Sequence, residues 1–338
     1  MRVTLRRAPR TQERARKRRS KLRVTRVPPF VVCCLTSAAI GLPVADSEAT
    51  AAIPTEAELH QMLVTRVDVQ HRGTGAIIEL VTSGGRQETA YGTVASGRKQ
   101  PWTGDTVVGV QSVTKVFTAL LLADMVRRHE LAVDDPVSRY LPPDVHVPIR
   151  AERQISLADL ATHTSGLPLR PSNLVSADPE NKYDGYTPDL LLSFLATYQL
   201  SQTPGTHYVY SNVGYGLLGQ ALSYAARKSY AQLIHEWIAQ PLNMTGTRLE
   251  PTEEMRHRSA VGYTTGGEAI RDKERGALDA AGALHSTAND LSRLLEVALG
   301  YRECPHIAKD IELTLTTRRP GGSDALDRNG TGLERVEG

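Results

Sequence analysis

Cysteine is scarce in this chain, which has only three among its 338 residues: Cys33, Cys34 and Cys304. The first two fall in an apolar segment near the N-terminus that we expect to be removed. Only Cys304 would then remain, which excludes an intramolecular disulfide. A chain that folds outside the cytosol without a disulfide depends on its hydrophobic core. A composition of 40% apolar and 23% charged residues is sufficient for one sizeable domain or two small ones.

Recognisable metal and phosphate motifs are also missing. The ten histidines show no His-Glu-x-x-His or other metal-ligand spacing, so we expect His163 and His207 to be structural or rim residues. No glycine-rich phosphate loop is present, and Asp134-Asp135 before Pro136 indicates a cap and not a catalytic acid pair. The sequence therefore predicts no metal and no cofactor.

The excess of positive over negative charge is confined to one end of the chain. Residues 1–28 hold twelve Arg or Lys against the single acid Glu13, a local charge of +11 in a chain whose total is +3. The remainder carries −8, which argues against a nucleic-acid-binding body.

An uncharged apolar stretch, Pro29 to Val44, follows the basic run. Its 16 residues are short for a membrane span and are typical of a secretory signal, with Ala49 and Ala51 as an Ala-x-Ala-like cleavage site. We expect residues 1–52 to be a basic region plus signal peptide, and residues 53–338 to form one domain that is secreted, periplasmic or in the cell envelope. A start codon assigned too far upstream, or an uncleaved anchor that attaches the chain to a membrane, remains an alternative.

Hydrophobic periodicity predicts strands first and helices afterwards. Residues 56–69 form an expected helix, 75–82 and 87–95 an expected antiparallel hairpin, and 105–110 a short apolar piece before the strongest helix, 113–128. Further helices are expected at 157–162, 189–197, 213–227, 230–238 and 288–299. This order predicts an α/β (α+β) fold, an antiparallel sheet flanked by helices with an all-helical insertion. Strands that return from the C-terminus to complete the sheet are hard to find, since residues 302–338 offer only one short run, at 311–317.

Ser112 and Lys115 form a Ser-x-x-Lys pair at the start of the strongest predicted helix. Such a pair arises about once by chance in a chain of this length, and Ser96 and Lys99 match it too, in a polar turn that we expect to be exposed and inert. At a helix start Lys115 lies one turn after Ser112 on the same face, where a desolvated amine can take the serine proton. A serine N-cap followed by an ordinary lysine is the plainer interpretation of this segment alone.

Tyr210 and Asn212 stand in a Pro- and Gly-containing turn before another apolar helix. A tyrosine aimed at a serine and a lysine can pass a proton to a leaving group, and an asparagine can hold a substrate amide. Taken alone, the pair is more often a packed aromatic with an N-cap asparagine.

Several segments, in order, closely resemble the class C β-lactamase family, with the penicillin-binding D-alanyl-D-alanine carboxypeptidase/endopeptidases as the nearest branch. They are VVGVQSVTKVFTALLLADMV, LAVDDPVSRYLPP, ISLADLATHTSGLP, PGTHYVYSNVGYGLLG, QPLNMTGT and AGALHSTANDLSRLLEVALG, and the likeness covers about residues 75–301. The resemblance implies that Ser112 is the acylated nucleophile, Lys115 its general base, Tyr210 a second proton-transfer group and Asn212 a substrate-amide contact. It implies an exported serine hydrolase acting on β-lactams, D-Ala-D-Ala peptides of peptidoglycan or small esters.

The chain departs from the family in one respect: we find no Lys-Thr-Gly or His-x-Gly element after the last helical block. The family's third element lines the substrate and supplies one of two oxyanion donors, and one such donor contributes on the order of 3 kcal/mol. Two interpretations stay open, an active serine hydrolase and a catalytically impaired truncated chain or wall-peptide-binding pseudoenzyme. From the missing element we expect slow labelling by penicillin and low turnover.

Overall fold

The structure is a computed structural model that describes residues 53–175, 181, 183, 185–264, 266–270 and 276–317. The expected basic region and signal segment, residues 1–52, lie outside the described residues, as do residues 318–338. None of the helices within the described ranges is long and apolar enough to cross a membrane.

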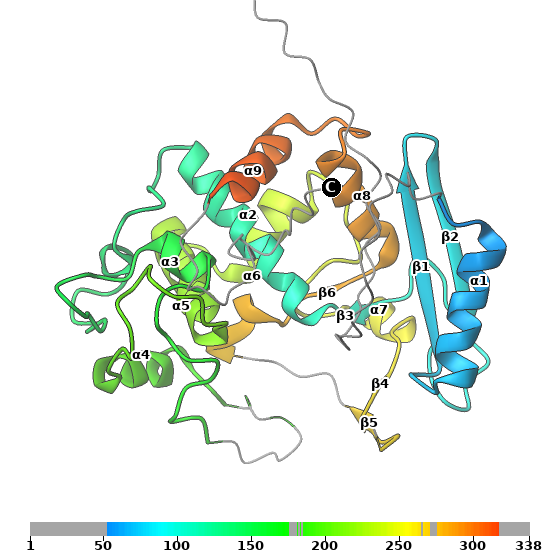
Figure 1. The fold of residues 1–338 in the computed structure, drawn as a ribbon, viewed down its shortest axis with the longest axis horizontal. Helices are drawn as coiled ribbons and strands as arrows, with labels where there is room; N and C mark the ends of the chain where they lie inside the picture. The colour runs from blue at the N-terminus through cyan, green and yellow to red at the C-terminus, as the bar shows by residue number, and fades with distance from the viewer. Residues whose placement is uncertain are drawn as a thin grey trace, which may run out of the picture.

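A helix and a hairpin form one side of the molecule (Figure 1). Helix α1 (Glu56–Val64) begins with a capping box between Thr55 and Glu58 and continues as a π-helical turn over Thr65–Val69. Strands β1 (Gly75–Thr82) and β2 (Gly85–Gly92) pair antiparallel, from Gly75 opposite Gly92 to Thr82 opposite Gly85. The hairpin predicted from the sequence is therefore present, with a two-residue turn.

Arg86 of β2 joins the hairpin to helix α8 (Ala288–Ala298). Its Nε donates to Glu296 Oε1 at 2.5 Å, and its Nη1 donates to the Asn289 carbonyl at 3.1 Å. These hydrogen bonds hold the strand layer against the helical block.

Helix α2 (Thr114–Arg127) runs through the centre of that block (Figure 1). Phe117, Leu121 and Met125 are fully buried on it, and each such side chain contributes about 1.5–3 kcal/mol of burial energy. Helix α2 is surrounded by other helical elements of the block: α3 (Leu157–Ala161), α4 (Pro188–Thr197), α5 (Asn212–Ala226), α6 (Tyr230–Ile234) and the π-helical turn η4 (His235–Ala239).

Two glycines of α5 let the 3-10 segment η5 (Gly276–Ala281) pack directly on this helix. A Cβ at Gly219 would lie 2.3 Å from the Ala280 Cβ, and one at Gly216 would lie 2.3 Å from the Leu278 side chain. The backbone of η5 thereby comes within hydrogen-bond reach of α2, where Thr118 Oγ1 donates to the Ala280 carbonyl at 2.8 Å.

A short antiparallel pair leads into α2. Strand β3 (Val108–Gly109) pairs with β6 (His285–Ser286), and the Val110 N–H donates to the Leu284 carbonyl at 2.9 Å. The Leu284 N–H in turn donates to Thr114 Oγ1 at 3.1 Å. The chain segment that carries Ser112 is therefore held on both sides by the segment after η5.

The remaining elements are short: η3 (Val137–Tyr140), α7 (Glu253–His257) and the antiparallel pair β4 (Gly262–Tyr263) and β5 (Ala269–Ile270). Elements α7, β4, β5 and β6 were not predicted from the sequence. Within the described ranges the strands form three separate two-stranded sheets. The predicted α/β class, with its helical block, is confirmed.

The short run at residues 311–317, which was the one candidate for a returning strand, is not a strand, because helix α9 (Pro305–Thr316) covers it. Proline at its first position has the backbone angle of a helix start, and Ile307, Ile311 and Thr314 are buried on one face. The helix packs on α2, where Arg127 Nε donates to the buried Asp310 Oδ1 at 2.7 Å. Figure 1 shows α9 beside α2.

Candidate active site

Ser112 lies in the 3-10 turn η2 (Gln111–Val113), directly before α2. Its side chain is exposed, and Gln111 just before it has a φ of 48°. Such a left-handed backbone angle costs a non-glycine residue of order 1 kcal/mol or more. The surrounding hydrogen bonds of Val110 and Thr114 retain it.

Lys115 is buried under Ser112, with 3% of its surface exposed. Its Nζ donates to Ser112 Oγ at 3.3 Å, to Asn212 Oδ1 at 2.9 Å and to the Ala281 carbonyl at 2.5 Å. These three acceptors can take the three protons of an ammonium group. The three contacts orient the amine toward the serine oxygen. A neutral Lys115 amine in this position can accept the Ser112 proton.

Tyr210 approaches the same serine from the segment before α5. Its hydroxyl donates to Ser112 Oγ at 2.7 Å, and Lys115 Nζ lies 4.8 Å from the centre of its ring. Ser112 Oγ therefore contacts two groups that can move protons.

Asn212 is the first residue of α5 and is half-buried. The N-cap of α5 is Ser211, whose Oγ accepts from the Gly214 N–H at 2.8 Å and donates to the Pro168 carbonyl at 2.8 Å. Asn212 is consequently not the cap, and its Oδ1 is turned to Lys115.

The structure thus brings the side chains of Ser112, Lys115, Tyr210 and Asn212 into one hydrogen-bonded group. It places the competing pair elsewhere: Ser96 and Lys99 are exposed on the loop after β2, where the Ser96 N–H donates to the Tyr263 hydroxyl at 2.8 Å.

Two contributors to the site were not assigned a role in it from the sequence. Ala281 acts through its backbone carbonyl, and although the segment 281–300 was part of the family resemblance, an alanine offers no side chain to notice. The other is His163, which is 6% exposed and lies behind Tyr210. Burial, and secondly the positive charge of Lys115, lower the pKa of His163 to about 3. His163 is therefore neutral at physiological pH. His207, by contrast, is exposed, and its ring is hydrogen-bonded to the Thr206 hydroxyl.

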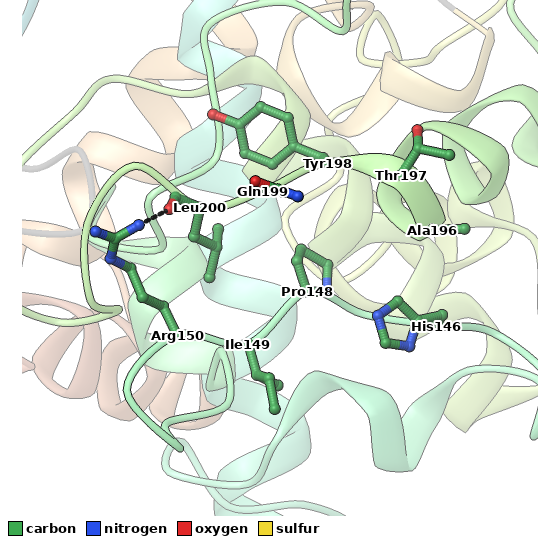
Figure 2. Close-up of a pocket in the computed structure, with 9 residues that line it drawn as sticks. All are labelled: His146, Pro148, Ile149, Arg150, Ala196, Thr197, Tyr198, Gln199 and Leu200. Carbon is green, nitrogen blue, oxygen red and sulfur yellow. Dashed lines mark hydrogen bonds between the residues drawn. The ribbon is translucent and has the colours of Figure 1, made fainter.

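Within the described ranges no group of three His, Cys, Asp or Glu side chains could hold a metal ion. A cavity of about 430 Å³ lies away from Ser112, between residues 146–150 and 196–200. Figure 2 shows the Arg150 guanidinium in it, donating to the Leu200 carbonyl. The cavity shares no residue with the Ser112 group, so the chemistry of the side chains, and not the cavity volume, identifies the candidate site.

The sequence matches the beta-lactamase family model over residues 59–335. It is 31% identical over 246 residues to the D-alanyl-D-alanine-carboxypeptidase/endopeptidase AmpH of Escherichia coli K12, a match covering 72% of this chain and 63% of that protein. It is 30% identical over 237 residues to a beta-lactamase of the same organism, covering 69% and 58%. The chain thus spans less than two thirds of each relative's length.

Solved structures with a similar fold include a D-alanine carboxypeptidase AmpC from Burkholderia cenocepacia. It superposes with a TM-score of 0.66 at 27% identity, covering 77% of this chain and 69% of that one. A beta-lactamase/D-alanine carboxypeptidase from Yersinia pestis superposes with a TM-score of 0.63 at 26% identity, covering 72% and 68%.

Proposed function

Because the chain belongs to the beta-lactamase family, we propose that it is a serine hydrolase whose Ser112 forms an acyl-enzyme with β-lactams or with D-Ala-D-Ala peptides. One observation carries the proposal: Ser112 Oγ is hydrogen-bonded to both Lys115 Nζ and the Tyr210 hydroxyl. A serine hydroxyl is a weak nucleophile until a neighbouring base takes its proton. Two such neighbours give the oxygen a proton acceptor for attack and a proton donor for the leaving group.

In the proposed acylation Ser112 Oγ attacks the carbonyl carbon of the lactam or the scissile peptide, and its proton passes to Lys115. The carbon–nitrogen bond then breaks, and the nitrogen receives a proton from Tyr210, which is replenished from Lys115. Water then attacks the ester, gives its proton to the same pair and releases Ser112 with its hydroxyl restored. Ser112 and its neighbours supply each proton transfer, so the proposed reaction requires no cofactor.

Asn212 is proposed to contact the substrate through its side-chain nitrogen. Its Oδ1 accepts from Lys115, and an asparagine amide carries two N–H donors on its other end. A donor there suits the carbonyl oxygen of the amide found in penicillins and in peptides.

Export is a further part of the proposal, supported by the basic run and the apolar segment within residues 1–52. N-terminal sequencing of the chain recovered from expressing bacteria tests it. Cleavage after Ala51 supports a signal peptide, and an intact N-terminus in the membrane fraction supports the anchor.

Two substrates compared side by side test the function: a chromogenic cephalosporin, and a peptide ending in D-Ala-D-Ala from which free D-Ala is measured. We expect hydrolysis of at least one of them, abolished in Ser112→Ala and unchanged in Ser96→Ala. The preferred substrate separates a β-lactamase from a peptidase. The proposal would be contradicted if neither compound were hydrolysed and neither acylated Ser112.

A further inference from the structure

The loop after α3 is bound tightly to the segment that carries Tyr210. The Thr164 carbonyl accepts from the Gly205 N–H at 2.7 Å, and the His163 carbonyl accepts from the Val209 N–H at 2.8 Å. His163 Nδ1 accepts from the Ser211 N–H at 3.1 Å. His163 therefore binds the residue before Tyr210 and the residue after it.

The imidazole ring of His163 also contacts the Tyr210 ring directly. The ring centres are 4.4 Å apart with planes inclined by 34°. Lys115 Nζ lies 4.8 Å from the same tyrosine ring, and Tyr215 contacts the imidazole from α5 at 4.9 Å between centres. The Tyr210 ring is thus confined by His163 and Lys115 while its hydroxyl reaches Ser112.

The backbone of His163 is held in an unusual conformation. Its φ is 60°, a left-handed value that is uncommon for residues other than glycine, although histidine adopts it more often than most. Because Nδ1 accepts the Ser211 N–H, the neutral imidazole carries its proton on Nε2. Both the backbone angle and the tautomer are set by the contacts that hold the Tyr210 segment.

Resting on the function proposed above, we propose that His163 is a positioning residue, which holds the Tyr210 hydroxyl against Ser112 through its ring and through hydrogen bonds on both sides of Tyr210. It exchanges no proton with the substrate. Its action passes entirely through Tyr210, so its loss slows acylation and leaves substrate binding largely intact.

Two replacements separate the ring from the hydrogen bond. His163→Asn keeps a side-chain acceptor and tolerates the left-handed angle, but removes the ring. His163→Phe keeps a ring beside Tyr210 but removes the acceptor of the Ser211 N–H. His129→Asn is the matched control, because His129 is also left-handed, with a φ of 59°, but is exposed at the end of α2.

Acylation by a fluorescent penicillin in the full-length chain gives two quantities: the labelled fraction, which counts competent protein, and the rate constant of labelling. We expect His163→Asn to lower the rate constant about ten- to a hundredfold, the size of effect of a small misplacement of a reacting group. The penicillin concentration for half-maximal rate should change much less. His163→Phe should have a rate constant between those of His163→Asn and the parent, with a lower labelled fraction than the parent. His129→Asn should match the parent in both quantities. A purely structural role for His163 would instead lower the labelled fraction and leave the rate constant intact.

A double-mutant cycle with Tyr210→Phe, which removes only the hydroxyl, tests whether His163 acts through that group. His163→Asn should then slow acylation little further in the Tyr210→Phe background. Equal losses in both backgrounds would overturn the proposal.

A crystal structure of His163→Asn gives an answer that does not depend on turnover. The distance from the Tyr210 hydroxyl to Ser112 Oγ, 2.7 Å in the parent, should lengthen beyond hydrogen-bond reach. An unchanged distance overturns the positioning role, whether or not the parent chain can be acylated. If the distance lengthens but the parent chain is not acylated, the positioning role stands and only the proposed function is rejected.

Discussion

The backbone carbonyl of Ala281 accepts a hydrogen bond from Lys115 Nζ at 2.5 Å, although the two residues are 166 positions apart in the chain. The contact exists because η5 packs on α5 at Gly216 and Gly219, where a side chain would collide with it. The orientation of the proposed catalytic amine therefore depends on two glycines that form no hydrogen bond with Ser112 or Lys115.

We predict that Gly219→Ala impairs the site as well as the fold. The added methyl would lie 2.3 Å from the Ala280 Cβ, so η5 must move, and the Ala281 carbonyl with it. Overpacking of this kind costs about 1–3 kcal/mol of stability. Urea unfolding measures that loss, and penicillin labelling should slow at temperatures where the variant is still folded. Tyr224→Ala, on the exposed side of the same helix, serves as the control. Equal labelling rates in the two variants would show that Gly219 does not influence the site.

Asn212→Asp should change the pH dependence of acylation. A carboxylate in place of the amide oxygen, 2.9 Å from Lys115 Nζ, favours the charged amine and so raises the pKa of Lys115 relative to the parent. Less neutral amine is then available at a given pH, and the acidic limb of the labelling rate should move to higher pH. Asn212→Ala, which adds no charge, should not move the limb upward. A limb displaced to lower pH in Asn212→Asp would exclude Lys115 as the base.

An ion pair at the N-terminus of α3, whose carboxylate is buried, should matter more than an exposed pair. Arg153 Nη2 lies 3.1 Å from Oδ1 of Asp159, whose side chain is fully buried and also accepts from the Ser156 N–H at 3.0 Å. Asp159→Asn should lower the free energy of unfolding by about 2–4 kcal/mol. Arg139→Gln breaks a pair with Asp135 in which Arg139 is 67% exposed, and should cost about 1 kcal/mol or less. Denaturant midpoints compare the two; similar losses would mean that burial is not what distinguishes them.

His163 should make the fold sensitive to acid. Burial, then the charge of Lys115, lower the pKa of His163 in the folded chain to about 3 from the ordinary 6.5. Between these values the unfolded chain binds a proton that the folded chain does not, so stability falls as pH decreases through this window. Urea unfolding of the parent should therefore lose about 1.4 kcal/mol more per pH unit than His163→Asn well inside the window. Parallel curves for the two chains would show that His163 takes up a proton without unfolding.

The main helices could be predicted because their apolar periodicity is local. The predicted helix 113–128 is found at Thr114–Arg127, with Ser112 and Lys115 at its start. Helix α9 could not be predicted in the same way, because Ile311, Leu313 and Leu315 alternate as in a strand. Its helical face appears only when Ile307 is included and α2 is present to cover it.

The candidate site was predictable where side chains carry the chemistry and not where the backbone does. Ser112, Lys115, Tyr210 and Asn212 belong to segments that resemble a known family in order. The carbonyl of Ala281 and the left-handed angle of Gln111 depend on packing between distant segments. His163 was expected to be structural or at the rim, and its contacts with both neighbours of Tyr210 become visible only in three dimensions.

Ser112 is proposed to be the residue that becomes acylated. Incubation of the full chain with a penicillin, followed by intact mass and peptide mapping, locates the adduct directly. We expect one penicilloyl group per chain, on the peptide that contains Ser112, and none in Ser112→Ala. An adduct on Ser96, or an adduct of undiminished amount in Ser112→Ala, would contradict it.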